Sequence, residues 1–199
     1  AIGVAAGILK TISNIPLPDA DLSTSTNYPS NSGNTEGEKV IADPLSMNSP
    51  LHVGFGPSKD GRLMTAIRAA APGKEGSLYK QMHLLNDNVF GPGRLWNLAA
   101  GPAKSNTAME KGVETNLKKA IIDKGAVMTF EAEVTYKHDP MAASDLEIDD
   151  DPDYYRFSRI DFKATQWDAD SVAGDYQPAA ANTDKEVDDI DGAYVLWDW

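Results

Sequence analysis

The sequence predicts an α+β fold, and three stretches of the chain support this prediction. Residues 127–136 alternate apolar and polar side chains, as a half-buried strand does. Residues 77–85 form a second strand-like run, and residues 104–124 repeat apolar side chains at helical spacing. A chain of 199 residues that is 41% hydrophobic can bury one sizeable core. We therefore expect additional antiparallel strands around these elements and long irregular segments at the periphery.

The N-terminal part alternates between short apolar runs and stretches rich in turn-forming residues. Residues 1–12 predict a short helix, and residues 16–38 predict a linker or a long surface loop because they are rich in Ser, Thr, Asn, Pro and Gly. Residues 40–47 supply apolar anchors. Residues 51–55 and 62–69 predict two short strands around a turn at 56–61.

The middle of the chain leads from a strand through an irregular loop into the longest predicted helix. The strand at 77–85 delivers His83, the loop spans 86–93, and residues 95–99 are expected to be short and extended. The helix would turn five apolar residues toward the core, and Gly125 stands where a C-terminal cap is expected. These five are Met109, Val113, Leu117, Ala120 and Ile121.

The C-terminal part continues with two strands and an acidic end. Residues 127–136 would bury Met128, Phe130, Ala132 and Val134, and residues 154–167 would pair with them across an acidic loop at 139–152. Residues 173–199 are expected to be loop-like. The chain is thus divided into an N-terminal extension (1–48), a core (49–140) and an acidic segment packed on the core (141–199).

Charge is distributed very unevenly along the chain. The net charge is −12, yet residues 1–140 hold 14 basic and 14 acidic side chains. Residues 141–199 hold 4 basic against 16 acidic ones, whereas residues 59–124 hold 11 basic against 6 acidic ones. The central part is therefore basic enough to approach a polyanion.

Several classes of protein are excluded by what the sequence lacks. There is no cysteine, so disulfides and thiolate metal sites are absent. No run approaches the roughly 20 apolar residues that cross a bilayer, so we expect no membrane span. The apolar residues 1–9 follow no basic start and precede no cleavage site, so a signal peptide is not expected.

Three residues in the middle of the chain together supply the groups that hydrolysis of a phosphodiester needs. A neutral imidazole, here that of His83, can take a proton from water, which typically contributes ~10²–10⁴-fold. Asn106 offers an amide oxygen to a hard cation such as Mg²⁺, which keeps several of its waters. Glu114 lies about 12 Å along a straight helix from Asn106 and about 80° around it, so it would reach the ion through water.

The intervals between these residues resemble those of a known family. Histidine, asparagine, asparagine and glutamate are separated by fourteen, nine and eight residues, within a pattern of the form HLLN, GPG and WNL. The chain is similar over about 77–136 to the DNA/RNA non-specific endonucleases of the ββα-metal (His-Me finger) type. It looks closest to toxin nuclease domains of bacterial contractile injection systems and other polymorphic toxins. The residues that carry this resemblance are His83, Asn97, Asn106 and Glu114.

The resemblance implies a ββα-metal core and a role for each of these residues. His83 would be the general base, Asn106 would ligate a single Mg²⁺ (or Mn²⁺ or another divalent ion in its place), and Glu114 would hold water on the metal. Asn97, counted with His83 and Glu114 among the catalytic residues, would brace the site and could contact the substrate. Members of the family usually carry Arg-Gly before the histidine, but Gln81 and Met82 stand there. Binding of phosphate would then fall to four basic residues: Lys80, Arg94, Lys104 and Lys118.

Each residue also has a plainer interpretation. A lone histidine is often structural. His52 and His138 lie outside the residue pattern that singles out His83. Asn106 can cap the helix, because asparagine favours that position. Glu110 fits a surface charge that pairs with a lysine.

The acidic segment has three interpretations. It is a solvated surface, a calcium site at 145–153 that lacks the EF-hand pattern, or a mimic of nucleic acid that covers the basic cleft.

The function that the sequence favours is metal-dependent cleavage of DNA, and of RNA as a second substrate, with little sequence preference. The resemblance implies a toxin effector that is secreted or injected into a target cell; without it, the expected location is the cytoplasm. It also implies a cognate immunity protein or a delivery apparatus as partners. The alternative is an inactive member of the same fold that serves as a binding or structural module, because Gln81 replaces the family's arginine.

Overall fold

The computed structural model describes residues 17–19, 22–23, 36–48, 56–57, 60–73, 78–137, 151–170, 175–178 and 183–188. Its largest element is an antiparallel sheet with the strand order β1-β2-β5-β6-β7, in which β8 also pairs with β6. The strands are β1 (Leu22–Ser23), β2 (Lys39–Leu45), β5 (Val127–Tyr136), β6 (Phe157–Asp170), β7 (Asp175–Pro178) and β8 (Thr183–Asp188). The described part of the chain is therefore an α+β fold with antiparallel sheets, as predicted.

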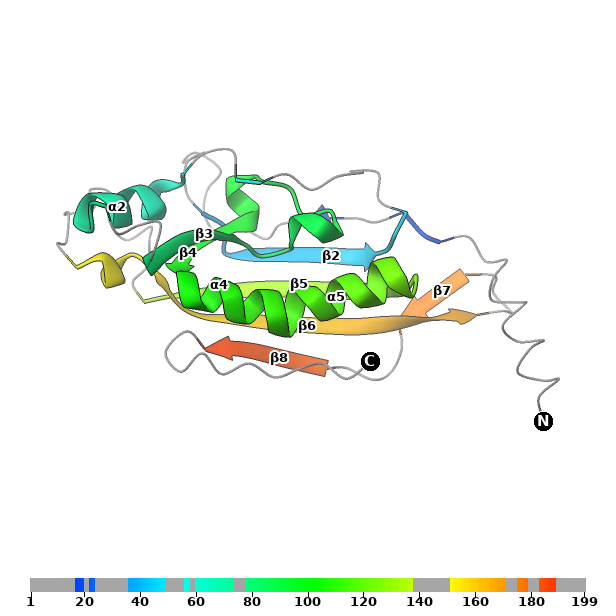
Figure 1. Cartoon of the computed structure of the whole chain (residues 1–199). Helices are drawn as coiled ribbons and strands as arrows, with labels where there is room; N and C mark the ends of the chain where they lie inside the picture. The colour runs from blue at the N-terminus through cyan, green and yellow to red at the C-terminus, as the bar shows by residue number, and fades with distance from the viewer. Residues whose placement is uncertain are drawn as a thin grey trace.

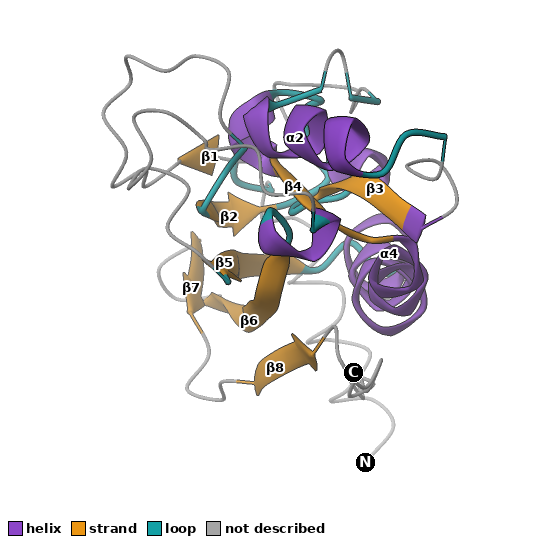
Figure 2. Ribbon diagram, turned by 90° about the vertical axis from the view of Figure 1, so that its left-hand side faces the viewer, coloured by secondary structure: helices purple, strands orange, loops and turns teal. Residues whose placement is uncertain are grey.

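A second, two-stranded sheet lies beside the main sheet and contacts two helical segments. The hairpin consists of β3 (Tyr79–His83) and β4 (Leu98–Pro102). Helix α2 (Arg62–Ala70) packs on β3, and a long helical run starts directly after β4. Figure 2 shows the hairpin between α2 and α4. Short 3₁₀ turns occur at η2 (Asp87–Val89), η3 (Leu95–Asn97) and η6 (Pro152–Tyr154).

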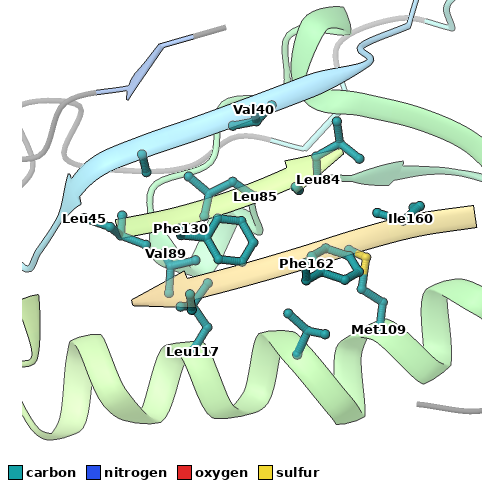
Figure 3. Close-up of a cluster of buried hydrophobic side chains, with 14 of the residues drawn as sticks. Val40, Leu45, Leu84, Leu85, Val89, Met109, Leu117, Phe130, Ile160 and Phe162 are labelled. Carbon is teal, nitrogen blue, oxygen red and sulfur yellow. The ribbon is translucent and has the colours of Figure 1, made fainter. Parts of the chain in front are cut away.

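The long helical run covers one face of the main sheet (Figure 1). It comprises α4 (Ala103–Met109), the π-type turn η4 (Glu110–Glu114), α5 (Thr115–Lys118) and a second π-type turn, η5 (Lys119–Asp123). All five apolar residues expected to face the core are buried. In Figure 3, Met109 and Leu117 point from the helix toward Phe130 and Phe162 of the sheet. The helix ends before Gly125, whose φ of 65° is the left-handed conformation expected of a C-terminal cap.

The central strand β5 confirms the predicted alternation. Met128, Phe130, Ala132 and Val134 are buried. On the opposite face, Lys39 of β2 forms ion pairs with Glu131 (2.6 Å) and Glu133 (2.9 Å). β6 pairs with β5 along nearly its whole length, which confirms the predicted hairpin.

The hairpin β3–β4 approaches the main sheet closely at one point. Gly101 pairs with Lys80, and a Cβ atom added to Gly101 would collide with the ring of Phe157 on β6. Only glycine allows this approach without displacing the ring. The contact fixes the hairpin, and thus the end of β3, relative to the core.

The strand predicted at 62–69 is wrong, because this segment is helix α2. Leu63, Met64 and Ile67 are buried together with Ala71, which is a helical spacing that a nine-residue run shows only faintly. The buried carboxylate of Glu36 accepts the backbone N–H groups of Leu63 (2.9 Å) and Met64 (2.8 Å). This capping interaction comes from a residue distant in the sequence and stabilises the start of the helix.

The two ends of the chain also contribute strands. β2 belongs to the segment predicted as an N-terminal extension, yet it pairs with both β1 and β5. The acidic segment supplies β6, β7 and β8, so the loop-like end predicted at 173–199 is wrong for 175–178 and 183–188. The helix predicted at 1–12, the strand at 51–55 and the acidic loop at 139–150 lie outside the described residues. No described helix is long and apolar enough to cross a membrane.

Candidate active site

His83 is the last residue of β3, which confirms the strand predicted to deliver it. It is partly buried and pairs with Leu98 at the end of the hairpin that the connecting loop closes. Because side chains alternate along a strand, Gln81 projects from the same face as His83, and Lys80 from the opposite face. Lys80 also lies about 10 Å along the strand from His83. The hairpin therefore places Gln81, and not Lys80, beside the histidine.

Asn97 forms hydrogen bonds with both sides of the loop that follows His83. Its side-chain oxygen accepts the backbone N–H of Leu85 (2.9 Å), and its amide nitrogen donates to the carbonyl oxygens of Leu85 and Pro92 (2.9 Å each). Its backbone oxygen accepts the N–H of Leu84 (2.8 Å). The side chain is fully buried and both amide hydrogens are used. Asn97 therefore holds the loop and does not itself reach the surface.

The loop between these anchors is tightly closed. The carbonyl oxygen of Asn86 accepts the N–H groups of Val89 (3.1 Å) and Gly91 (2.9 Å). A Cβ atom on Gly91 would collide with the carbonyl oxygen of Leu85, so the loop needs glycine there. Phe90 has a φ of 73°, a conformation that is uncommon for a bulky residue. The loop is thus held in one shape by its own backbone.

Glu114 is joined to this loop by a hydrogen bond. The amide nitrogen of Asn86 donates to Glu114 Oε2 at 2.6 Å, although the two residues are 28 positions apart. Burial raises the pKa of Glu114 to about 7; the bond from Asn86 lowers it, and the charges of Glu110 and Asp87 raise it. A carboxyl that titrates near neutrality next to two other carboxylates is a favourable partner for a cation.

Asn106 lies in the middle of α4, in the helix that packs on β3 and β4. It does not cap the helix, because α4 begins at Ala103 and Pro102 occupies the capping position. Its side chain is partly exposed and forms no hydrogen bond with the residues that the structure describes. The amide oxygen is therefore available as a ligand for a hard cation.

A cation at this site would depend on that amide oxygen. Among the described residues, no three His, Cys, Asp or Glu side chains form a group that could hold a metal ion. Mg²⁺ does not need such a group, because it is commonly held by one or two protein oxygens and retains several waters. Asn106 could offer one such oxygen, and Glu114, two helical turns further on, would act through water.

The other basic residues predicted to bind phosphate are exposed but dispersed. Arg94 stands at the start of η3, Lys104 in the first turn of α4, and Lys118 at the end of α5. Lys104 lies three residues after Gly101, the partner of Lys80, so these two lysines share the end of the hairpin that is remote from His83. Arg94 precedes Asn97 by one 3₁₀ turn and lies four residues before Leu98, the partner of His83.

The structure links three of the four predicted central residues through one loop. Asn97 bonds the loop after His83, and Asn86 bonds Glu114 to the same loop. Asn86 had no role assigned from the sequence, although it belongs to the HLLN pattern that carried the resemblance. His52, His138 and most of the acidic stretch considered for calcium lie outside the described residues.

Comparison of the chain with protein-family models, with curated proteins and with solved structures finds no match in any of the three.

Proposed function

We propose that this protein is a metal-dependent nuclease that hydrolyses DNA, and RNA as a second substrate, with little sequence preference. In this proposal β3, β4 and the helix that begins with α4 form a ββα-metal core. The observation that carries the proposal is the hydrogen bond of Asn86 to Glu114, because it joins the loop after His83 to the helix of Asn106. The bond links the carboxylate of Glu114 to the loop that follows His83, and Asn106 lies on the same helical run as Glu114.

The reaction follows from the chemistry of these groups. A ring nitrogen of His83 accepts a proton from the water that attacks the phosphorus, and a new P–O bond forms. The bond from phosphorus to the 3′ oxygen breaks, and that oxygen takes a proton from a second water molecule, which leaves a 3′ hydroxyl. Asn106 would hold Mg²⁺ through its amide oxygen, and Glu114 would fix water beside it. Bound there, the ion supplies positive charge next to the phosphate. Asn97 contributes by keeping the loop in place.

The setting of this activity is also a proposal and rests on the resemblance of the sequence to toxin nuclease domains. A nuclease secreted or injected into a target cell would require a cognate immunity protein in the cell that makes it. The basic charge of residues 59–124 supports a polyanionic substrate.

Plasmid cleavage tests the function directly. Purified wild type and the His83→Ala variant are each incubated with DNA or RNA in Mg²⁺ and in EDTA. We expect cleavage only by wild type with Mg²⁺, and a loss of about 10²–10⁴-fold in the variant, as expected for a general base. His138→Ala is the matched control, since it removes a histidine to which the proposed mechanism assigns no part.

Two outcomes would contradict the proposal. Cleavage that survives in His83→Ala would locate the activity elsewhere. A folded wild type that cuts neither DNA nor RNA with any divalent metal would favour a binding module, in agreement with Gln81 at the position of the family's arginine.

A further inference from the structure

The amide of Asn86 has one orientation that its surroundings allow. Its oxygen accepts the backbone N–H and the side-chain amide of Asn88, both at 2.8 Å. Its nitrogen faces Glu114 Oε2 at 2.6 Å. The reverse orientation would set the amide nitrogen against the N–H of Asn88 and the amide oxygen against a carboxylate. The loop therefore presents a fixed N–H donor to Glu114.

The carboxylate that receives this bond has only this partner among the described residues. Glu110 and Asp87, which act on Glu114 through their charges, repel its ionised form. The Asn86 donor opposes that repulsion and occupies Oε2. Oε1 accepts no hydrogen bond from the described residues, so it is left for water.

The loop that carries Asn86 is itself anchored at both ends. Asn97 bonds Leu85 on one side and Pro92 on the other, and the carbonyl oxygen of Asn86 closes the turn between them. A side chain on such a loop cannot follow the movements of the helix. It restrains the helix residue to which it is bonded.

We infer that Asn86 is a positioning residue, which holds the carboxylate of Glu114 so that one oxygen stays directed at the water around the cation. The inference rests on the proposed function and deepens it, because it adds a residue that controls metal affinity without touching the metal or the substrate. Residues in this position typically change metal affinity by ~10- to 100-fold when they are substituted.

Asn86→Asp separates this role from the support of the loop. Aspartate has the same shape and retains the oxygen that accepts the N–H of Asn88, but it turns an oxygen toward Glu114 in place of the donor. We expect the Mg²⁺ concentration for half-maximal cleavage to rise about 10-fold or more and kcat to fall. The KM for DNA should remain within about twofold, because no contact with the polyanion is removed.

Asn88→Ala is the matched control. It removes a polar side chain from the same loop and adds no charge, while its backbone N–H still bonds Asn86 and the bond from Asn86 to Glu114 is kept. We expect a change of less than about threefold in the Mg²⁺ midpoint, because the donor to Glu114 is retained. Equal effects of the two variants would overturn the inference.

The double variant Asn86→Asp, Glu114→Gln tests whether Asn86 acts through Glu114. The glutamine nitrogen can donate to the aspartate, so the hydrogen bond returns with reversed polarity. We expect the Tm of the metal-free protein to recover relative to Asn86→Asp, while Mg²⁺ binding measured by calorimetry stays at the level of Glu114→Gln alone. A further loss of Mg²⁺ affinity in the double variant would show that Asn86 does not act through Glu114.

Calorimetry also separates a failure of this inference from a failure of the proposed function. A wild type that binds Mg²⁺ but does not cleave would contradict the nuclease, while the effect of Asn86→Asp on binding would still decide the role of Asn86. A wild type that cleaves, with Asn86→Asp unchanged in midpoint and affinity, would contradict the positioning role alone. Absence of both binding and cleavage would reject both.

Discussion

Glu114 lies in surroundings that disfavour its own charge. It is largely buried, two carboxylates lie near it, and one neutral donor stabilises its ionised form. Since burial is the main cause, the pKa of Glu114 is raised to about 7 from 4.5. Such a group contributes stability that is fully present below pH 4.5 and is lost as the pH rises through about 7.

Glu114→Gln should therefore stabilise the metal-free protein at high pH while it abolishes the proposed activity. Glutamine stays neutral and still accepts the bond from Asn86, so the variant avoids the cost of a buried charge. Above pH 7 we expect its free energy of unfolding to exceed that of wild type by up to about 3 kcal/mol, from ~1.4 kcal/mol per pKa unit. Below pH 4.5 the two should agree.

Urea denaturation in EDTA across this pH range measures the difference. Glu36 also has a raised pKa, mainly because of burial, so both proteins retain the decline in stability that this residue causes. A stability difference that does not change with pH would contradict the assignment of the titration to Glu114.

Ser105, next to Asn106, is a second residue in an unfavourable setting. It is fully buried, and its hydroxyl has no hydrogen-bond partner among the described residues. Ser105→Ala removes an unsatisfied polar group from a helix, so we expect a gain of about 1 kcal/mol in the free energy of unfolding. Chemical denaturation measures it.

Ser46 provides the matched control for that substitution. It is equally buried, but its hydroxyl donates to the carbonyl of Pro18 (2.6 Å) and accepts the N–H of Asn48 (3.0 Å). Ser46→Ala should therefore lose about 1–3 kcal/mol. A loss of the same size at Ser105 would mean that its hydroxyl is bonded.

At the level of single elements, α2 depends on one distant side chain. Glu36 accepts the N–H groups of Leu63 and Met64, and Gly61 leaves room for its carboxylate. Glu36→Ala would leave these buried donors without a partner, so we expect a loss of about 2–4 kcal/mol and faster hydrogen exchange at Leu63 and Met64.

Two further variants serve as comparisons for Glu36→Ala. Glu36→Gln keeps an acceptor oxygen and should lose less. Asp60→Ala removes an exposed partner of Arg68 and should change stability by less than about 1 kcal/mol. Unchanged exchange at Leu63 in Glu36→Ala would contradict the capping role.

The elements that could be predicted from the sequence are those with a long or strict pattern. The helical run shows apolar residues over five turns, and β5 alternates over ten residues, so both were located correctly. Helix α2 was missed because its nine residues are short and its cap lies 27 residues away. β7 and β8 carry too few apolar residues to be recognised, and they are strands because β6 offers them a free edge.

The candidate site stays a prediction. Residue intervals select His83, Asn97, Asn106 and Glu114, because intervals depend only on counting along the chain. The role of Asn86 could not be identified in this way, since its bond to Glu114 exists only after the hairpin and the helix have packed together. The capping role considered for Asn106 was wrong, because the helix starts three residues earlier.

At the level of the whole molecule, the acidic segment is part of the fold. β6 pairs with β5 and buries Phe157, Ile160, Phe162 and Ala164. A fragment of residues 1–140 lacks these side chains and exposes the edge of β5, so we expect it not to fold cooperatively. A fragment of residues 1–188 keeps every described strand and should fold.

Circular dichroism and thermal unfolding of the two fragments measure this difference. Cooperative unfolding of residues 1–140 would show that the main sheet is not needed for a stable core. The expected result also affects the hypothesis that the acidic segment, residues 141–199, covers the basic residues of 59–124. That hypothesis has to be tested by neutralising carboxylates, because deleting residues 141–199 would remove the core of the sheet.

The borders of the main sheet have a consequence for how the protein behaves in concentrated solution. Its outer described strands are short: β1 has two residues, β7 has four and β8 has six. β6 is 14 residues long, and β7 and β8 divide its outer edge between them. A neighbouring molecule that tried to extend the sheet would find only brief rows of backbone groups, which is how natural proteins resist fibril formation.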